Sequence, residues 1–596
     1  MDALMPLAIA VPLLAAVVLR SLPPSVDRRV RDGLAVLSAA ATALVTAWLL
    51  RASAAETLVH WVAGWTPREE NAIGIALVAD PIGAGIAALG AVLMTAVLLT
   101  KWNRETVDDR SHTLALIFLG GFCGFAFAGD LLTLFVFLET TSIAAYAITG
   151  YRPQELASLQ GAVNFALTNT IGATLFLTGA AVLYAHAGTP NLAEIAELLN
   201  GAGVEAPTVI ALGLMTAGLF TKAAVVPFHF WHADSHAVAP SWAAAFFSAV
   251  LIQVALYAIA RLHWTAFAGP VEAHTDELRA FYAVFAVLTA GVAAVMCLVQ
   301  DDLKRMLAFS TVAHLGIAAI GFATFEPDGI AGAGTYVVGH GLVKAGLFLA
   351  AGWLLVQHGT VSLAAFSGRA YRLPLLGGIL AVGGLGLAGL PPFGMYTGKV
   401  LIDEAAEAVG YGWLSYVALA AAALTGAAVL RAAALVGLRA TDRGGDRGDP
   451  DRDGGQGGQR VTLLILVPAV ALMAASAVIG PLPTFIAAAE EAGERFVEVD
   501  AYVDAVLHGE AVAEPRPEPE DIFTAESLVE SALAALAALI LVAASLAIRP
   551  TAAALAPLGA AVGGLRRVHS GHVGDYVTWL VAGTAAIGIT LSTLLR

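Results

Sequence analysis

LFTKAAVVPFHF, residues 219–230, places Lys222 inside an apolar stretch, five residues before a proline. A second stretch, AGLPPFGMYTGKV at residues 388–400, places Lys399 after a double proline. Proline removes a backbone donor and clashes with the preceding turn, so each stretch predicts a helix that breaks within the membrane. Such a break persists only where protein or water satisfies the freed backbone groups. The second break lies five predicted spans after the first, which favours two five-helix repeats of inverted topology.

The composition around these stretches indicates a membrane protein. Of the 596 residues, 58% are apolar and 13% are charged, whereas about 25% of the residues in soluble proteins are charged. Apolar runs long enough to cross roughly 30 Å of hydrocarbon recur along the chain. The predicted fold class is therefore an all-α polytopic membrane protein. We place about sixteen transmembrane helices at 3–21, 33–51, 76–100, 112–128, 130–150, 161–186, 206–226, 240–262, 278–300, 303–323, 331–356, 373–400, 411–437, 461–480, 526–548 and 573–595.

Basic residues fall unequally on the two sides that these spans define. Most loop lysines and arginines, including Arg28, Lys101, Arg305 and Arg567, follow odd-numbered spans. Loops rich in lysine and arginine stay in the cytoplasm. We therefore expect a multi-pass protein of a bacterial or archaeal-type cell membrane, with both termini outside. Lys304 and Arg305, at a cytoplasmic helix start, are expected to snorkel or to anchor this orientation.

Composition also divides the chain into regions. We predict N-terminal transmembrane helices at 1–110, a first repeat at 111–262, a second repeat at 278–437, a flexible cytoplasmic loop at 438–460 and C-terminal helices with an acidic outer segment at 461–596. Residues 441–460 of this loop are rich in Gly, Asp and Arg and include no apolar residue with which to build a core. Acidic residues crowd 481–526, which we interpret as a solvated linker, with a cation-attracting surface as the alternative. Within this segment, 481–510 fits an interfacial helix.

Four ionisable residues inside predicted spans are the main candidates: Glu139, Lys222, Lys344 and Lys399. A charge at mid-bilayer costs roughly 2.5–3.5 kcal/mol on insertion scales, which makes these residues candidates for function. His340 stands one helical turn before Lys344, on the same face. A buried lysine keeps its proton beside a carboxylate and releases it when the carboxylate moves away. The pattern predicts a proton relay. The alternative for Glu139 and Lys222 is a static ion pair that locks two helices together.

Further polar residues lie close to this row. Gln253 and His314 fall inside spans and are candidates for a relay or a water path, although His314 is equally explained as a satisfied polar side chain. Four more candidates lie in PFHFWHADSHAVAPS: His229, His232, Asp234 and His236. We interpret this group as feeding or accepting protons at a cytoplasmic mouth, with a metal site as the minor alternative. GLGLAG at 384–389 fits the dinucleotide-binding pattern G-x-G-x-x-G, but it lies in an apolar span and not between a strand and a soluble helix. We expect no cofactor, no bound metal and no catalytic site of the chain's own.

Several segments resemble the antiporter-like subunits shared by Mrp-type Na+/H+ antiporters, respiratory complex I and membrane-bound hydrogenases. These segments are DLLTLFVFLETTSIAAYAITGY (130–151), KAAVVPFHFWHADSHAVAPS (222–241), DLKRMLAFSTVAHLG (302–316), HGLVKAGLFLAAG (340–352) and AGLPPFGMYTGK (388–399). The resemblance covers roughly residues 75–440 and implies a pair of inverted five-helix repeats. A C-terminal segment, RRVHSGHVGDYVTWLVAG at 566–583, is similar to the tail of the longer complex I-like members.

The resemblance also implies roles for individual residues. Glu139 is similar to the carboxylate that partners the lysine of the first broken helix, which is Lys222 here. Lys344 with His340 resembles the central relay, and Lys399 resembles the exit-side lysine. The chain departs from the family at Gln253, where a lysine or histidine is usual. Glutamine holds water by hydrogen bonds but carries no proton at physiological pH.

These features predict a proton-translocating subunit of a multisubunit Na+/proton antiporter, closest in outline to the D-type member of the Mrp complexes. The alternative is the same module in a redox-driven pump, either a complex I-like NADH-quinone oxidoreductase or a membrane-bound hydrogenase. A third interpretation is a membrane scaffold that transports nothing. The first two imply other membrane subunits as partners, with protons and Na+ as the transported ions and no nucleic acid.

Overall fold

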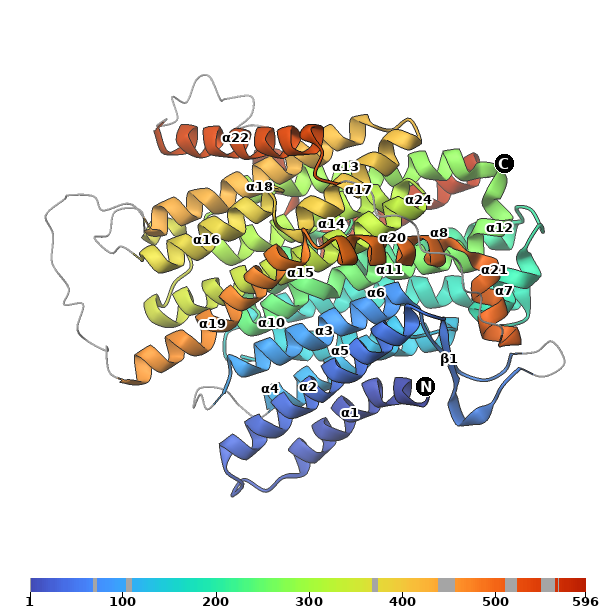
Figure 1. Ribbon diagram of the computed structural model, residues 1–596, viewed down its shortest axis with the longest axis horizontal. Coiled ribbons are helices and arrows are strands. Elements are labelled where there is room, and N and C mark those ends of the chain that lie inside the picture. The colour runs from blue at the N-terminus through green and yellow to red at the C-terminus, as the bar shows by residue number, and fades with distance from the viewer. Residues whose placement is uncertain are drawn as a thin grey trace, which may run out of the picture.

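The computed structural model describes residues 2–67, 72–102, 110–366, 373–437, 456–509, 522–547, 563–565 and 567–596. Figure 1 shows these residues as a bundle of helices with one small hairpin of strands at its edge. The longer elements are α1 (Met5–Ser21), α2 (Arg28–Ser53), β1 (Leu58–Trp61), β2 (Ala76–Ala79), α3 (Pro81–Leu99), α4 (Arg110–Ala126), α5 (Leu131–Thr149), α6 (Leu156–Ala187), α7 (Leu192–Leu199), α8 (Ala206–Lys222), α9 (Phe230–Val238), α10 (Ser241–Phe246), α11 (Ile252–Leu262), α13 (Thr275–Leu298), α14 (Leu303–Ala323), α15 (Pro327–His358), α16 (Pro374–Leu387), α17 (Gly394–Ala408), α18 (Trp413–Gly437), α19 (Gln456–Ile479), α20 (Pro483–Val497), α21 (Val499–Val503), α22 (Ala525–Ala547) and α24 (Val573–Leu594).

Each predicted span coincides with helical residues, and the fold class is a polytopic helical membrane protein. Among the described residues, ten helices are long and apolar enough to cross a membrane, or eleven if the bent pair α19 and α20 forms one span. Three shorter apolar helices, α1, α8 and α16, match further predicted spans. The numbers differ partly because the run Ser241–Leu298 contains two predicted spans. The total of sixteen and the repeat boundaries stay predictions.

Two predicted spans begin or run differently in the structure. The span at 76–100 begins as strand β2, which pairs with β1 in an antiparallel hairpin, and only then becomes helix α3. Val78 continues this pairing by donating from its backbone N–H to the carbonyl of Phe127, 2.7 Å away. The span at 240–262 contains a π-helical turn, Phe247–Leu251, between α10 and α11. Periodicity does not reveal either feature, since β2 is apolar at every position.

Both predicted breaks are present and have the same backbone course. Helix α8 ends at Lys222, Ala224 then adopts a left-handed conformation with φ 56°, and α9 begins at Phe230. Helix α16 ends at Leu387, Gly389 has φ 78°, and α17 begins at Gly394. Each break includes one cis peptide bond before proline, at Pro227 and Pro392. The predicted span at 373–400 is therefore two helices, with Lys399 on the second.

The centre of the bundle is formed by α14 and α15. In their most apolar stretches, 94% and 89% of the residues are buried inside the protein. Helix α15 packs against α14, α17, α19 and α20, and Figure 1 places it in the middle of the molecule. By contrast, only 28% and 22% of the corresponding stretches of α22 and α24 are buried. These two C-terminal helices therefore lie at the margin and expose apolar side chains laterally.

The acidic segment differs from the predicted solvated linker over its first part. Helix α20 packs against α15, with Glu490 buried and with Arg495 bound to Glu491 at 2.7 Å. It bends by 78° from the Leu463–Ile479 part of α19. Residues 510–521 of the acidic segment, and residues 438–455 of the predicted flexible loop, lie outside the described part of the chain.

Close packing of α15 against α17 gives a test of the fold. A Cβ atom added at Gly398 would lie 2.7 Å from the backbone carbonyl oxygen of Gly332, so the two helices must separate to accept it. We expect Gly398→Ala to lower the free energy of unfolding by roughly 1–3 kcal/mol, the usual cost of overpacking. Gly378→Ala is the matched control, since nothing lies within 4 Å of its added Cβ. Equal thermal midpoints for the two variants would contradict this packing.

Candidate functional site

Lys222 is held at the first break by three side chains of one helix face. Its Nζ atom donates to Glu139 at 2.9 Å, to Ser142 at 2.6 Å and to the Tyr146 hydroxyl at 3.4 Å. These partners are spaced three and four residues apart on α5, so they project from the same side. Lys222 is buried and Glu139 is partly exposed. The structure thus brings the two predicted partners together as an ion pair.

A small cavity adjoins this ion pair. Its volume is about 20 Å³, and Thr141, Ser142, Asn169 and Lys222 contribute its polar lining. A space of this size admits about one water molecule. Leu251 of the π-helical turn, with Val254 and Ala255 of α11, lines it with apolar side chains. These three side chains offer no hydrogen bond.

Gln253 joins the first half of the bundle to the second. Its amide nitrogen lies 3.2 Å from Nδ1 of His340 and 3.3 Å from the Ser248 carbonyl oxygen. The π-helical turn just before α11 adds a residue to the helix and so shifts the direction of the following side chains, a feature frequent at functional sites. Gln253 and His340 are both buried. Gln253, where the sequence departs from the family, is thus in direct contact with His340.

Lys344 occupies the middle of the row and differs from the outer lysines. It is fully buried, and Nζ donates to the Leu307 carbonyl oxygen at 2.8 Å and to the Ser310 hydroxyl. Within the described ranges, no carboxylate lies in ion-pair distance of it. His340 lies one turn earlier on α15, as predicted. The central lysine is therefore solvated by neutral oxygens alone.

His314 fits the alternative interpretation of a satisfied polar side chain. Its Nδ1 atom contacts the Tyr336 hydroxyl at 2.5 Å, and its Nε2 atom contacts the Thr425 hydroxyl at 3.0 Å. The ring nevertheless lies beside His340, with centroids 5.2 Å apart. Because both neighbouring hydroxyls are donors and acceptors, this arrangement also leads from His340 toward Tyr336 on the Lys399 side.

Lys399 binds two carboxylates that sequence reasoning did not identify. It donates to Asp403, one turn later on α17, and to Glu530 of α22 at 3.2 Å. The sequence could have predicted Asp403, because its i,i+4 spacing from Lys399 places both residues on one helix face. No sequence pattern predicts Glu530, since it comes from a helix more than a hundred residues away. Arg261 was also missed, although it lies in a predicted span; it is buried and forms an ion pair with Asp80.

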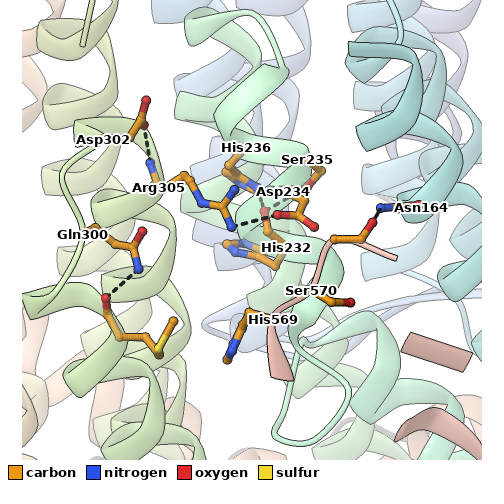
Figure 2. A network of polar contacts seen from close by, with 12 residues as sticks. Asn164, His232, Asp234, Ser235, His236, Gln300, Asp302, Arg305, His569 and Ser570 are labelled. Atoms are coloured by element: carbon orange, nitrogen blue, oxygen red, sulfur yellow. Dashed lines mark hydrogen bonds and ion pairs between the residues drawn. The ribbon is translucent and has the colours of Figure 1, made fainter. Parts of the chain in front are cut away.

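The histidines of the first break are buried, and Figure 2 shows His232 and His236 close to Asp234. His229 contacts His569 of the C-terminal segment, with the two Nε2 atoms 3.0 Å apart. The rings of His232 and His236 lie close together, with centroids 3.9 Å apart. Asp234 is bound by Arg305 at 2.9 Å and by the Tyr576 hydroxyl. His569 and Tyr576 belong to the C-terminal similarity at 566–583, but no local pattern predicted this contact.

The prediction that Lys304 snorkels is wrong. Its side chain is buried, and Nζ donates to the carbonyl oxygens of Ala237 and Ala239 at 2.9 and 2.5 Å. These are orphan acceptors at the C-terminal end of α9, where a cation is favoured by the helix dipole. Arg305 likewise binds Asp234 rather than extending freely toward the membrane surface. A metal site was the minor alternative for the histidines of the first break. The described residues contain no group of three or more His, Cys, Asp or Glu arranged to hold a metal ion.

Known proteins resemble this chain in sequence and in fold. Residues 128–425 match the family described as "NADH:quinone oxidoreductase/Mrp antiporter, TM". NADH-quinone oxidoreductase subunit N of Desulforudis audaxviator is 33% identical over 389 residues, which are 63% of this chain and 74% of the relative.

Two solved structures superpose over 85% of this chain and 100% of theirs. A chain of the Mrp complex from Dietzia sp. DQ12-45-1b has a TM-score of 0.73 at 24% identity, a likeness of fold alone. A chain of the archaeal membrane-bound sulfane sulfur reductase has a TM-score of 0.72 at 26% identity.

The Glu139–Lys222 pair provides a stability test. Glu139→Gln should leave a buried ammonium without its carboxylate, and losing one partner of a buried pair costs about 3–5 kcal/mol, less here because Glu139 is partly exposed. Adding Lys222→Met should recover part of the loss, since no uncompensated charge then remains. Thermal unfolding of the purified protein measures both effects. A double variant less stable than Glu139→Gln alone would show that the two residues do not interact.

Proposed function

Because the chain belongs to the NADH:quinone oxidoreductase/Mrp antiporter transmembrane family, we propose that it moves protons across the membrane along the row that runs through Glu139, Lys222, His340, Lys344 and Lys399. The observation that carries this proposal is the unequal solvation of the three buried lysines. Lys222 and Lys399 have carboxylate partners, while Lys344 has only neutral oxygens. An amine held by neutral oxygens gives up its proton more readily than one beside a carboxylate.

The unequal solvation of the three lysines supports a relay in which the proton leaves Lys344 more readily than it leaves Lys222 or Lys399. A proton on the central lysine is the least stabilised of the three, so it moves on when a neighbouring group becomes free to accept it. Gln253 and the His314–Tyr336 pair supply polar groups around His340, one helical turn before Lys344. The apolar stretch between Lys222 and Gln253 must be crossed by water, which makes it the step most open to control.

We propose a redox-driven complex as the setting, ahead of the cation antiporter that the sequence placed first. In support, the relative with 33% identity bears the name NADH-quinone oxidoreductase subunit N. The Mrp likeness supports the second candidate only at the level of the fold. Purification of the native complex with identification of its subunits distinguishes them. Iron–sulfur or quinone-binding partners favour the first, and small membrane subunits with Na+-dependent proton release from vesicles favour the second.

Removing the central amine tests the relay. Lys344→Ala should abolish proton transport by the complex in liposomes, measured with an internal pH dye, while its subunits still purify together. Arg20→Ala, at the exposed end of α1, is the control and should transport normally. Full transport by Lys344→Ala would favour a scaffold that moves no ions.

The second carboxylate of Lys399 gives a graded test. Glu530→Gln keeps Asp403 in place but removes one negative charge, so Lys399 holds its proton less tightly. We expect proton transport several-fold slower than in the unmodified complex. Glu526→Gln, one turn earlier on α22 and exposed, is the matched control and should have no effect. Equal rates for the two variants would exclude Glu530 from the row.

A further inference from the structure

A polar groove opens beside the histidine cluster. Its volume is about 460 Å³, and its polar lining comes from Gln300, Asp301, Asp302, Arg305, Ser362 and His569. Gln300, Asp301 and Asp302 belong to the connection between α13 and α14, on the side where the sequence places the basic loops. His569 is half-buried, and it is the groove residue that also contacts the interior histidines. Figure 2 shows it beside the Arg305–Asp234 pair, with His232 and His236 behind.

Hydrogen bonds fix the tautomer of His569. Its Nδ1 atom lies 2.7 Å from the Leu565 carbonyl oxygen, which accepts only, so Nδ1 carries a hydrogen. The neutral ring therefore has its free lone pair on Nε2, the atom that faces Nε2 of His229. A proton taken up by the pair is held between two nitrogens. It moves inward when the bond to Nε2 of His569 breaks and the bond to Nε2 of His229 forms.

Beyond His229, the cluster continues as nitrogens that have no hydrogen-bond partner among the described residues. These are Nδ1 of His229, both ring nitrogens of His232 and Nε2 of His236, all buried. A buried polar atom without a partner costs free energy unless a water molecule binds it. Nδ1 of His236 bonds the His232 carbonyl oxygen at 2.8 Å, which leaves Nε2 as a proton acceptor. Both rings interact electrostatically with Lys344.

We propose that His569 takes up protons from this groove and passes them through His229, His232 and His236 to Lys344. The C-terminal segment before α24 would then supply the outermost group of an uptake path that reaches the central lysine without crossing the Glu139–Lys222 pair. This inference rests on the proposed function, because it needs Lys344 to carry protons. It adds a route, a direction of supply and a residue outside the matched family region.

The groups around His569 suit it to pass a proton on rather than to hold it. Burial lowers the pKa of His569 below its usual value; Asp234 opposes this shift and Arg305 adds to it. Burial therefore disfavours the charged ring, and a proton bound at His569 is released readily toward His229. Asp234 is bound by Arg305 and by the Tyr576 hydroxyl, and these contacts hold the geometry beside His569.

Chemical rescue tests the path in the intact complex reconstituted in liposomes. We expect His569→Ala to slow proton transport at least several-fold, and imidazole added on the groove side to restore much of the rate. His569→Gln keeps a hydrogen-bonding side chain beside His229 but cannot carry a proton, so it should be as slow as His569→Ala. His572→Ala is the matched control, because this exposed histidine lies three residues away in the same segment. Thermal midpoints and subunit composition exclude misfolding.

Each outcome separates this proposal from the one on which it rests. Normal transport by His569→Ala, or full activity of His569→Gln, overturns the uptake path. Slow transport by His569→Ala that imidazole does not restore also overturns the uptake path, since free imidazole should replace the missing proton-carrying ring. Lys344→Ala in the same assay should be inactive with or without imidazole. If Lys344→Ala is active, the proposed function fails as well.

Discussion

Solvation of cationic side chains inside an apolar bundle is the constraint on which this structure depends. An ammonium group removed from water needs oxygen atoms around it, and the cost of leaving it without them is several kcal/mol. The protein meets this need with oxygen atoms from several helices: α5 serves Lys222, α14 serves Lys344, and α17 itself together with α22 serves Lys399. The positions of these helices follow from that requirement, and so does the burial of α14 and α15 at the centre.

The two broken helices answer the same constraint for the backbone. A break in the membrane exposes peptide groups, and here each is enclosed by neighbouring elements. The indole of Trp231 donates to the Thr221 carbonyl oxygen at 2.9 Å, and Lys304 covers carbonyl oxygens at the end of α9. The side chains that satisfy a break thus also tie it to α14.

Much of this arrangement was predictable from the sequence, for identifiable reasons. Long apolar runs predicted the helices, and prolines beside Lys222 and Lys399 predicted both breaks. The Glu139–Lys222 contact followed from the family resemblance. Residues that act across long separations were not predictable: Glu530 and His569 meet their partners only through tertiary packing. Strand β2 was mistaken for helix because a fully apolar run has no period that distinguishes the two.

The attachment of α22 at the margin of the bundle has a mechanical consequence. Glu530 reaches Lys399 from this peripheral helix, whereas Asp403 reaches it from the same helix as the lysine itself. A sideways shift of α22 by a few ångströms would withdraw one negative charge and leave the other in place. The electrostatic potential at Lys399 therefore depends on the lateral position of α22, a helix that borders lipid or a neighbouring chain. A movement at the periphery of the protein would thus change the potential at a buried lysine.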